Sequence, residues 1–173
     1  MELIGLVLLL LILPILFYLT SYPFMTGGAF AVLVAVGRGD TESERGYTLR
    51  EWSGLGWRRP VLGLAMLFFL FSLAGIPPTG GFLGKYVIFQ AAVHSGQWLL
   101  AVVGVLNAVV AAYYYLRVLV VMYMREPETD ELPLPVSPGM ASVMVIAVVG
   151  VLYLGLAPGR LLDLFQGLAT ALI

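Results

Sequence analysis

The sequence predicts an all-α fold, a polytopic transmembrane helix bundle with one discontinuous helix. Hydrophobic residues make up 61% of the 173 residues and charged residues 11%, whereas a soluble domain is usually about 45–50% apolar and about 25% charged. The apolar residues form four long stretches, and two prolines with three glycines interrupt one of them. A water-soluble fold of this length cannot bury so much apolar surface, so we expect a single transmembrane domain over residues 1–173.

The first apolar stretch covers residues 3–37 and contains no charged side chain. As one helix it would be more than about 50 Å long, because an α-helix rises about 1.5 Å per residue, and a bilayer core is only about 30 Å thick. Either the segment is one long helix that projects from the membrane, or it folds back near Thr20–Pro23. The sequence favours one helix, kinked at Pro14 and Pro23, because a fold-back would lack a polar turn.

The second apolar stretch, residues 60–94, contains its own interruption. Proline and glycine at this density cannot continue a helix. We therefore expect two half-helices, about 60–76 and 81–94, that together cross the membrane once. The residues expected to form the break are Gly75, Pro77, Pro78, Gly80 and Gly81.

Two further spans are predicted at about 98–124 and 140–157, followed by a short amphipathic tail. If residues 60–94 cross once, the polar segments 38–59 and 125–139 lie on the same side. The first of them contains five arginines, namely Arg38, Arg45, Arg50, Arg58 and Arg59. Basic loops favour the cytoplasmic side. Two full crossings would separate the basic regions, so the charge distribution favours the single broken crossing.

Lys85 is the candidate catalytic residue, as a proton relay. It lies about one turn into the second half-helix, within an apolar stretch. An uncompensated charge there costs at least about 2.5–3.5 kcal/mol, which makes an ionisable group inside a membrane a functional hypothesis. Desolvation and the positive end of the half-helix dipole should both disfavour the ammonium form, so Lys85 could release a proton. The structural alternative is a lysine that extends to the interface.

The remaining polar residues give weaker signals. His94 is expected at the opposite interface, as a structural histidine or as a proton exit. Asn107 is most simply a helix–helix hydrogen-bonding residue, and Tyr113–Tyr115 an aromatic belt. The chain has no cysteine and one histidine, which excludes thiolate-bound iron–sulfur clusters and bis-histidine haem on this chain. We therefore expect no cofactor and no metal here, and the net charge of −1 gives no reason to expect nucleic acid as a partner.

Several short motifs resemble one protein family. They are Arg59-Pro60, Ser72-Leu73-Ala74-Gly75-Ile76-Pro77-Pro78, Gly81-Phe82-Leu83-Gly84-Lys85 and Tyr113-Tyr114-Tyr115-Leu116-Arg117. Together they resemble the C-terminal part of the antiporter-like N subunit of bacterial NADH:quinone oxidoreductase, respiratory complex I. The Gly-Ile-Pro-Pro break is common to the whole antiporter-like superfamily, whereas the Gly-Lys-Tyr and Tyr-Tyr-Tyr-Leu-Arg runs are typical of the N subunit.

The resemblance implies a non-redox, proton-translocating membrane subunit, with Lys85 as the channel lysine of the discontinuous helix. It also implies a multi-pass location in the bacterial cytoplasmic membrane, with the lipid bilayer, other complex I membrane subunits and neighbouring antiporter-like subunits as partners. The family's glutamate and further lysines on earlier helices have no counterpart in this sequence. Two alternatives therefore stay open: an ion-exchange subunit of a multisubunit cation/proton antiporter or membrane-bound hydrogenase, and a structural fragment that does not conduct.

Overall fold

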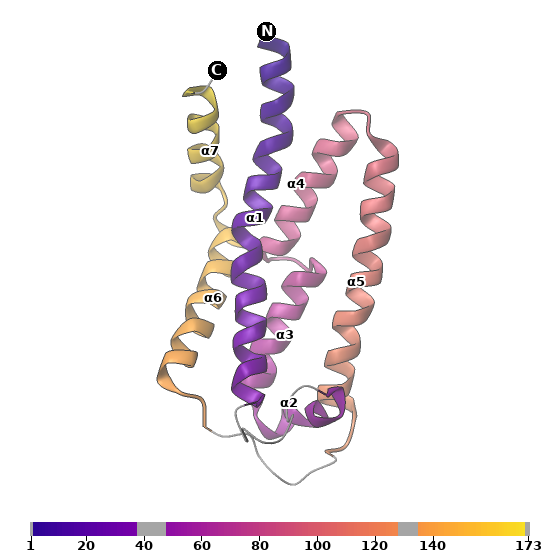
Figure 1. The fold of residues 1–173 in the computed structure, drawn as a ribbon, viewed down its shortest axis with the longest axis vertical. Coiled ribbons are helices and arrows are strands. Elements are labelled where there is room, and N and C mark those ends of the chain that lie inside the picture. The colour runs from indigo at the N-terminus through magenta and orange to yellow at the C-terminus, as the bar shows by residue number, and fades with distance from the viewer. Residues whose placement is uncertain (1, 38–47, 128–134, 172–173) are drawn as a thin grey trace.

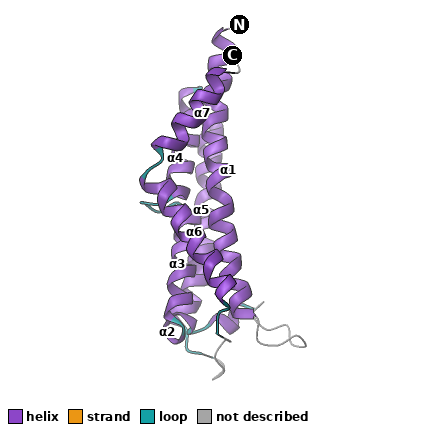
Figure 2. Cartoon of the chain, turned by 90° about the vertical axis from the view of Figure 1, so that its left-hand side faces the viewer, coloured by secondary structure: helices purple, strands orange, loops and turns teal. Residues whose placement is uncertain are grey.

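The computed structural model describes residues 2–37, 48–127 and 135–171, which form helices and connecting loops without a strand in these ranges (Figures 1 and 2). This confirms the predicted all-α class. The elements in chain order are α1 (Glu2–Gly37), the 3-10 helix η1 (Leu49–Trp52), α2 (Leu55–Arg58), α3 (Pro60–Ala74), α4 (Gly80–His94), α5 (Trp98–Met124), α6 (Pro138–Leu156) and α7 (Gly159–Ala171).

Three of the described helical segments are long and apolar enough to cross a membrane: Ile12–Gly37, Trp98–Met124 and Pro138–Leu156. The first lies in α1, which runs as one helix through both of its prolines. Of the two alternatives for this stretch, the structure therefore contains the long helix and no fold-back. α1 is also the central element of the bundle, since it contacts α3, α4 and α6 along its length (Figure 1).

The predicted discontinuity is present between α3 and α4. α3 ends at Ala74 and is capped by Gly75, whose φ of 91° is readily adopted only by glycine. The Gly75 N–H donates to the carbonyls of Phe71 and Ser72 at 3.0 Å each. Thr79 then begins α4, because its hydroxyl accepts from the Phe82 N–H at 3.4 Å and donates to the Ile76 carbonyl at 2.8 Å. The two half-helices follow one another along the bundle, and α5 returns past both of them (Figure 1).

The described parts of the polar segments on either side of this crossing lie at the same end of the bundle. η1 and α2 contact α5, and the indole N–H of Trp57 donates to the carbonyl of Tyr123 at 2.9 Å. The chain then leaves α5 and begins α6 at this same end (Figure 1). Residues 38–47 and 128–134 of the two polar segments lie outside the described residues. The turn between α4 and α5 lies at the opposite end, as one broken crossing requires.

This arrangement predicts which engineered cysteines share a side of the membrane. The chain contains no native cysteine, so single substitutions give clean labelling. Thr48→Cys and Glu126→Cys, both at exposed positions, should react with an impermeant thiol reagent from one side of sealed vesicles. Ser95→Cys, in the α4–α5 turn, should react only from the other side. Labelling of Thr48→Cys and Glu126→Cys from opposite sides would contradict the single crossing.

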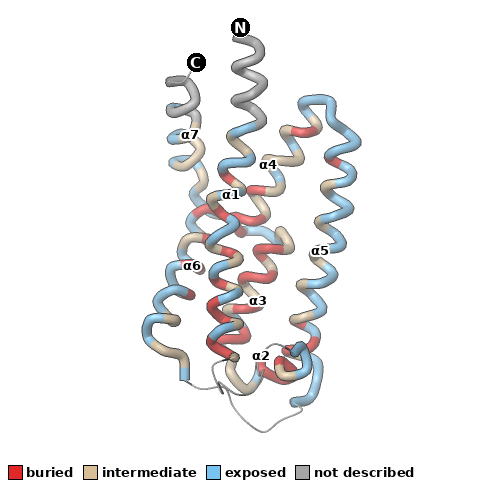
Figure 3. The backbone as a smooth tube through the Cα atoms, in the orientation of Figure 1, coloured by how far each residue is buried: buried red, intermediate tan, exposed pale blue. Residues whose placement is uncertain are grey.

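The buried core lies where α1 packs on α3, whereas α5 is exposed along most of its length (Figure 3). Phe69 of α3 is fully buried, and a Cβ added at Gly28 of α1 would overlap its ring. Gly27, by contrast, has no atom within 4 Å of an added Cβ. Of these two adjacent glycines, only Gly28 allows the close approach of α1 and α3.

The two glycines therefore form a matched pair for a stability measurement. Gly28→Ala should lower the free energy of unfolding by about 1–3 kcal/mol, because the added methyl group forces the Phe69 ring out of its place. Gly27→Ala should leave it unchanged or raise it by up to about 1 kcal/mol, since alanine favours a helix over glycine. Thermal unfolding of the detergent-solubilised protein measures both. Equal effects would show that the α1–α3 contact does not depend on Gly28.

Candidate functional site

Lys85 lies in the second turn of α4 and reaches back across the break to the end of α3. Its Nζ donates to the carbonyl of Leu73 at 2.7 Å and to that of Ala74 at 3.2 Å. These are the last two residues of α3, so their carbonyls have no partner within the helix. Lys85 is half-buried, and its ammonium group thus joins the two halves of the discontinuous helix.

The contact of Lys85 with α3 differs from the expected effect of the helix dipole. We expected the positive end of the second half-helix dipole, together with desolvation, to disfavour the charge of Lys85. The structure instead places Nζ at the C-terminal end of α3, where the helix dipole is negative and attracts a cation. The difference arises because Lys85 points across the break to residues 11 and 12 positions earlier, a contact that helix periodicity does not reveal.

Gly75 makes room for this arrangement as well as ending α3. A Cβ at this position would lie 3.2 Å from Cδ of Lys85 and 3.6 Å from its Nζ. The positive φ of Gly75 would also strain any other residue. The position of the Lys85 side chain therefore depends on the absence of a side chain at Gly75.

The other glycines of the break hold α4 against its neighbours. A Cβ at Gly81 would overlap the Ser72 carbonyl and lie 2.6 Å from Sδ of Met25, so α3 and α1 both approach this position closely. A Cβ at Gly80 would lie 3.1 Å from Cβ of Leu154 in α6. The start of α4 is therefore enclosed by three helices, and Lys85 follows one turn later.

The remaining predicted residues lie away from this contact. His94 is exposed and ends α4 beside the α4–α5 turn. It lies nine residues after Lys85, which corresponds to roughly 13 Å along the helix, so the two side chains do not form one site. Pro77 and Pro78 are exposed in the segment between α3 and α4.

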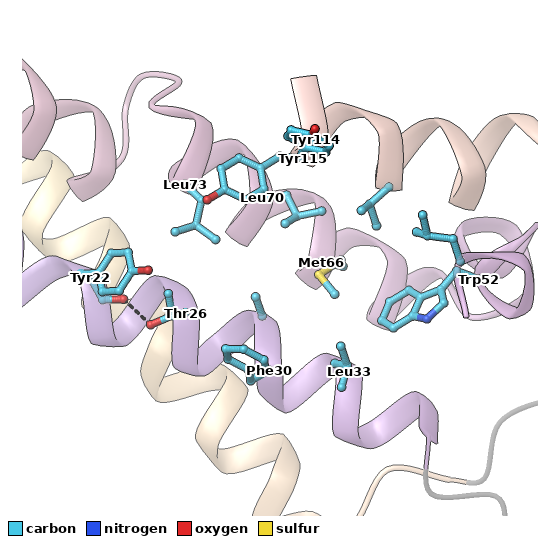
Figure 4. A pocket seen from close by; sticks show the side chains of 13 residues that line it. Tyr22, Thr26, Phe30, Leu33, Trp52, Met66, Leu70, Leu73, Tyr114 and Tyr115 are labelled. Carbon is cyan, nitrogen blue, oxygen red and sulfur yellow. Dashed lines mark hydrogen bonds between the residues drawn. The ribbon is translucent and has the colours of Figure 1, made fainter. Parts of the chain in front are cut away.

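A cavity of about 470 Å³ between α1, α3 and α5 was not predicted from the sequence. Figure 4 shows Tyr22 and Thr26 of α1 on one side and Tyr114 and Tyr115 of α5 on the other. Leu73, whose carbonyl accepts from Lys85, lines its wall. The rest of the lining is mostly apolar: Ala29, Phe30, Leu33, Leu49, Trp52, Met66, Leu70 and Val118.

The tyrosines of α5 are the signal that could have revealed this cavity. An aromatic belt lies at the ends of a membrane span. Tyr114, however, is ten residues before the end of α5, or about 15 Å along the helix. Tyr114 and Tyr115 line the cavity, and their interpretation as part of an aromatic belt stays a prediction. Among the residues that the structure describes, no group of three His, Cys, Asp or Glu side chains could hold a metal ion.

Comparison with known proteins identifies the family. A family profile described as the transmembrane part of NADH:quinone oxidoreductase and the Mrp antiporter matches residues 2–111. The chain belongs to this antiporter-like membrane family. With its long apolar helices, it is a multi-pass membrane protein. The match covers α1, the broken helix and half of α5, so Lys85 and its carbonyl partners lie within it.

Curated relatives of this antiporter-like chain are longer than the chain itself. It is 45% identical over 152 residues to NADH-quinone oxidoreductase subunit N of Trichlorobacter lovleyi, covering 88% of this chain and 31% of the relative. To subunit N of Mycobacteroides abscessus it is 44% identical over 165 residues, covering 89% and 30%. The chain thus spans about a third of the length of the curated relatives that it matches.

A solved structure supports the same fold for the antiporter-like chain. A chain of respiratory complex I from Thermus thermophilus with bound aureothin matches with a TM-score of 0.72 and 39% sequence identity, over 87% of this chain and 34% of that one. The resemblance to the N subunit inferred from short motifs is therefore confirmed over most of the chain.

Proposed function

We propose that this chain is the Lys85-containing part of subunit N of a bacterial, proton-translocating NADH:quinone oxidoreductase. One observation carries the proposal. The single lysine of the chain lies within a discontinuous transmembrane helix and bridges its two halves. Irregular backbone at membrane depth is tolerated where it is buried in protein or lines a hydrated cavity, and such broken helices are typical of ion pathways.

In the proposed mechanism Lys85 receives a proton from one side of the broken helix and gives it up towards the other. While protonated, its ammonium group donates to the carbonyls of Leu73 and Ala74. Loss of the proton leaves a neutral amine with two N–H groups instead of three. The hydrogen bonds from Lys85 to the carbonyls of Leu73 and Ala74 are then weaker. Proton movement and the α3–α4 contact are therefore coupled at one side chain. His94, at the far end of α4, is a candidate for the proton exit.

Electron transfer takes place on other subunits in this proposal. The absence of cysteine and the single histidine leave the chain without the usual ligands of an iron–sulfur cluster or a bis-histidine haem. Its partners would be the other membrane subunits of the complex, including neighbouring antiporter-like subunits, in the bacterial cytoplasmic membrane.

An ion-exchange role in a multisubunit cation/proton antiporter is the second candidate, because the matching family includes the Mrp antiporter. The names of the similar curated proteins favour the oxidoreductase, since both relatives described above are subunit N of NADH-quinone oxidoreductase. A structural fragment that does not conduct is a third candidate, because the chain spans only about a third of these relatives.

The decisive experiment compares coupled proton uptake with electron transfer in Lys85 variants. Sealed membrane vesicles containing the complex are given NADH, and proton uptake is recorded beside the rate of quinone reduction. The proposal expects the Lys85 variants to lower the proton-to-electron ratio. An unchanged ratio would favour the fragment that does not conduct, and sodium-dependent proton exchange without NADH would favour the antiporter.

A further inference from the structure

The last turn of α6 meets the discontinuous helix at its break. A Cβ added at Gly155 would overlap the carbonyl oxygen of Pro78 and lie 2.7 Å from the carbonyl carbon of Thr79. These are backbone atoms, which cannot turn aside as a side chain can, so only glycine leaves room for this approach. Figure 1 shows the end of α6 beside the segment that joins α3 to α4. α6 therefore packs on the backbone of the break itself.

Gly80, the first residue of α4, is held between α6 and α1. On the side of α6, a Cβ added at Gly80 would lie 3.1 Å from Cβ of Leu154 and 3.3 Å from the carbonyl oxygen of Val151. On the side of α1 it would lie 3.4 Å from Oγ of Ser21. Val151, Leu154 and Ser21 are all buried, so the start of α4 is closely packed on both sides.

The position of this first turn determines the reach of Lys85. Lys85 lies five residues after Gly80 in the same helix, so a displacement of the start of α4 also moves the lysine. Its Nζ donates to the carbonyls of Leu73 and Ala74 at 2.7 and 3.2 Å. A shift of α4 away from α3 by about 1 Å would take both contacts beyond hydrogen-bond distance.

We propose that the last turn of α6 holds the break closed and that Gly155 is a positioning residue for Lys85. The inference deepens the proposed function and rests on it, because the position of Nζ affects transport only if Lys85 exchanges protons. α6 lies outside residues 2–111, the part of the chain that the family profile matches. Its role follows from its packing on Pro78, Thr79 and Gly80. When this packing is disturbed, α4 moves away from α3, and Lys85 loses both of its acceptors.

Acetylation of the resting complex tests the position of Lys85. Lys85 is the only lysine of the chain, so its peptide, analysed by mass spectrometry after brief treatment of the membranes with N-hydroxysuccinimidyl acetate, reports on one side chain. Gly155→Ala should raise the rate of acetylation severalfold, because Nζ no longer donates to two carbonyls. Gly159→Ala is the matched control and should keep the parent rate, since a Cβ there meets no atom within 4 Å. Equal rates in the two variants would overturn the proposal.

A second pair of variants separates positioning from stability, and it also serves if Gly155→Ala does not assemble. Leu154→Ala and Met144→Ala each shorten a buried side chain of α6, 4% and 8% exposed. Met144 lies ten residues before Leu154, or about 15 Å along the helix, and thus away from the break. Both variants should unfold at a lower temperature, but only Leu154→Ala should raise the rate of Lys85 acetylation. A similar rise in Met144→Ala would contradict the role assigned to the end of α6.

Proton uptake then tests whether the position of Lys85 matters for transport. In the assembled complex Gly155→Ala should lower the proton-to-electron ratio. Combined with Lys85→Met it should lower the ratio no further than Lys85→Met alone, because both changes act through one side chain. Additive losses would show that Gly155 acts independently of Lys85 and would overturn the proposal. A normal ratio in Lys85→Met would refute the proposed function, whereas the acetylation rates, measured without turnover, would still decide whether α6 positions Lys85.

Discussion

Lys85→Met should abolish the proton flux that passes through this subunit. A positioned proton-transfer group typically contributes a factor of about 10²–10⁴, so flux through this path should fall at least about 100-fold. The total proton-to-electron ratio should fall by the share that this subunit carries. Proton uptake into sealed vesicles, set beside the rate of quinone reduction by NADH, measures both quantities. A normal ratio in an assembled Lys85→Met complex would show that the lysine serves only the contact with the end of α3 and is not a proton relay.

Lys85→Arg separates the relay from the structural contact. Arginine retains N–H donors for the carbonyls of Leu73 and Ala74 but stays protonated under any realistic perturbation. The Lys85→Arg variant should therefore lose proton uptake as the Lys85→Met variant does, but its free energy of unfolding should fall less. Methionine leaves both carbonyls without this donor, at a cost of about 1–3 kcal/mol. Arg160→Met, at an exposed cation of α7, is the control and should change neither quantity.

Gly81→Ala should give the largest loss of stability among the glycine substitutions of the break. Its Cβ would overlap the backbone carbonyl of Ser72 and crowd Sδ of Met25. A flexible side chain could turn aside, but the carbonyl cannot move unless α3 moves with it. We expect a loss of about 3 kcal/mol, the upper end of the usual cost of overpacking. The midpoint of thermal unfolding should fall by roughly 6 to 12 °C.

The matched control for this substitution is Gly139→Ala. Gly139 lies in the first turn of α6, and an added Cβ there meets no atom within 4 Å, so the unfolding midpoint should stay within about 2 °C of the parent value. Gly81→Ala should also lower proton uptake, because displacement of α4 moves Lys85 away from Leu73 and Ala74. A Gly81→Ala protein that unfolds at the parent temperature would show that α3 and α4 are not tightly packed here.

The sequence was sufficient for the class of fold and for the place of the break. Apolar stretches of this length indicate transmembrane helices because lipid must be the solvent. Pro77 and Pro78 between glycines end a helix for reasons local to the backbone, and α3 does end at Ala74. The arginines of residues 38–59 predicted a single crossing because loop charge determines orientation. Lys85 was conspicuous for the same local reason, since a cation in an apolar stretch is costly.

Only the tertiary structure decided what these elements contact. From their length alone, residues 3–37 could form either one long helix or a fold-back. In the structure they form one helix through both prolines, and this helix packs on α3, α4 and α6. The direction of Lys85 depends on where α3 ends relative to α4, and that depends on close approaches at Gly75 and Gly81. The sequence by itself did not show that Tyr114 and Tyr115 of α5 line a cavity. Their position beside a cavity follows from how α1 and α5 pack on α3, which is a non-local property of the fold.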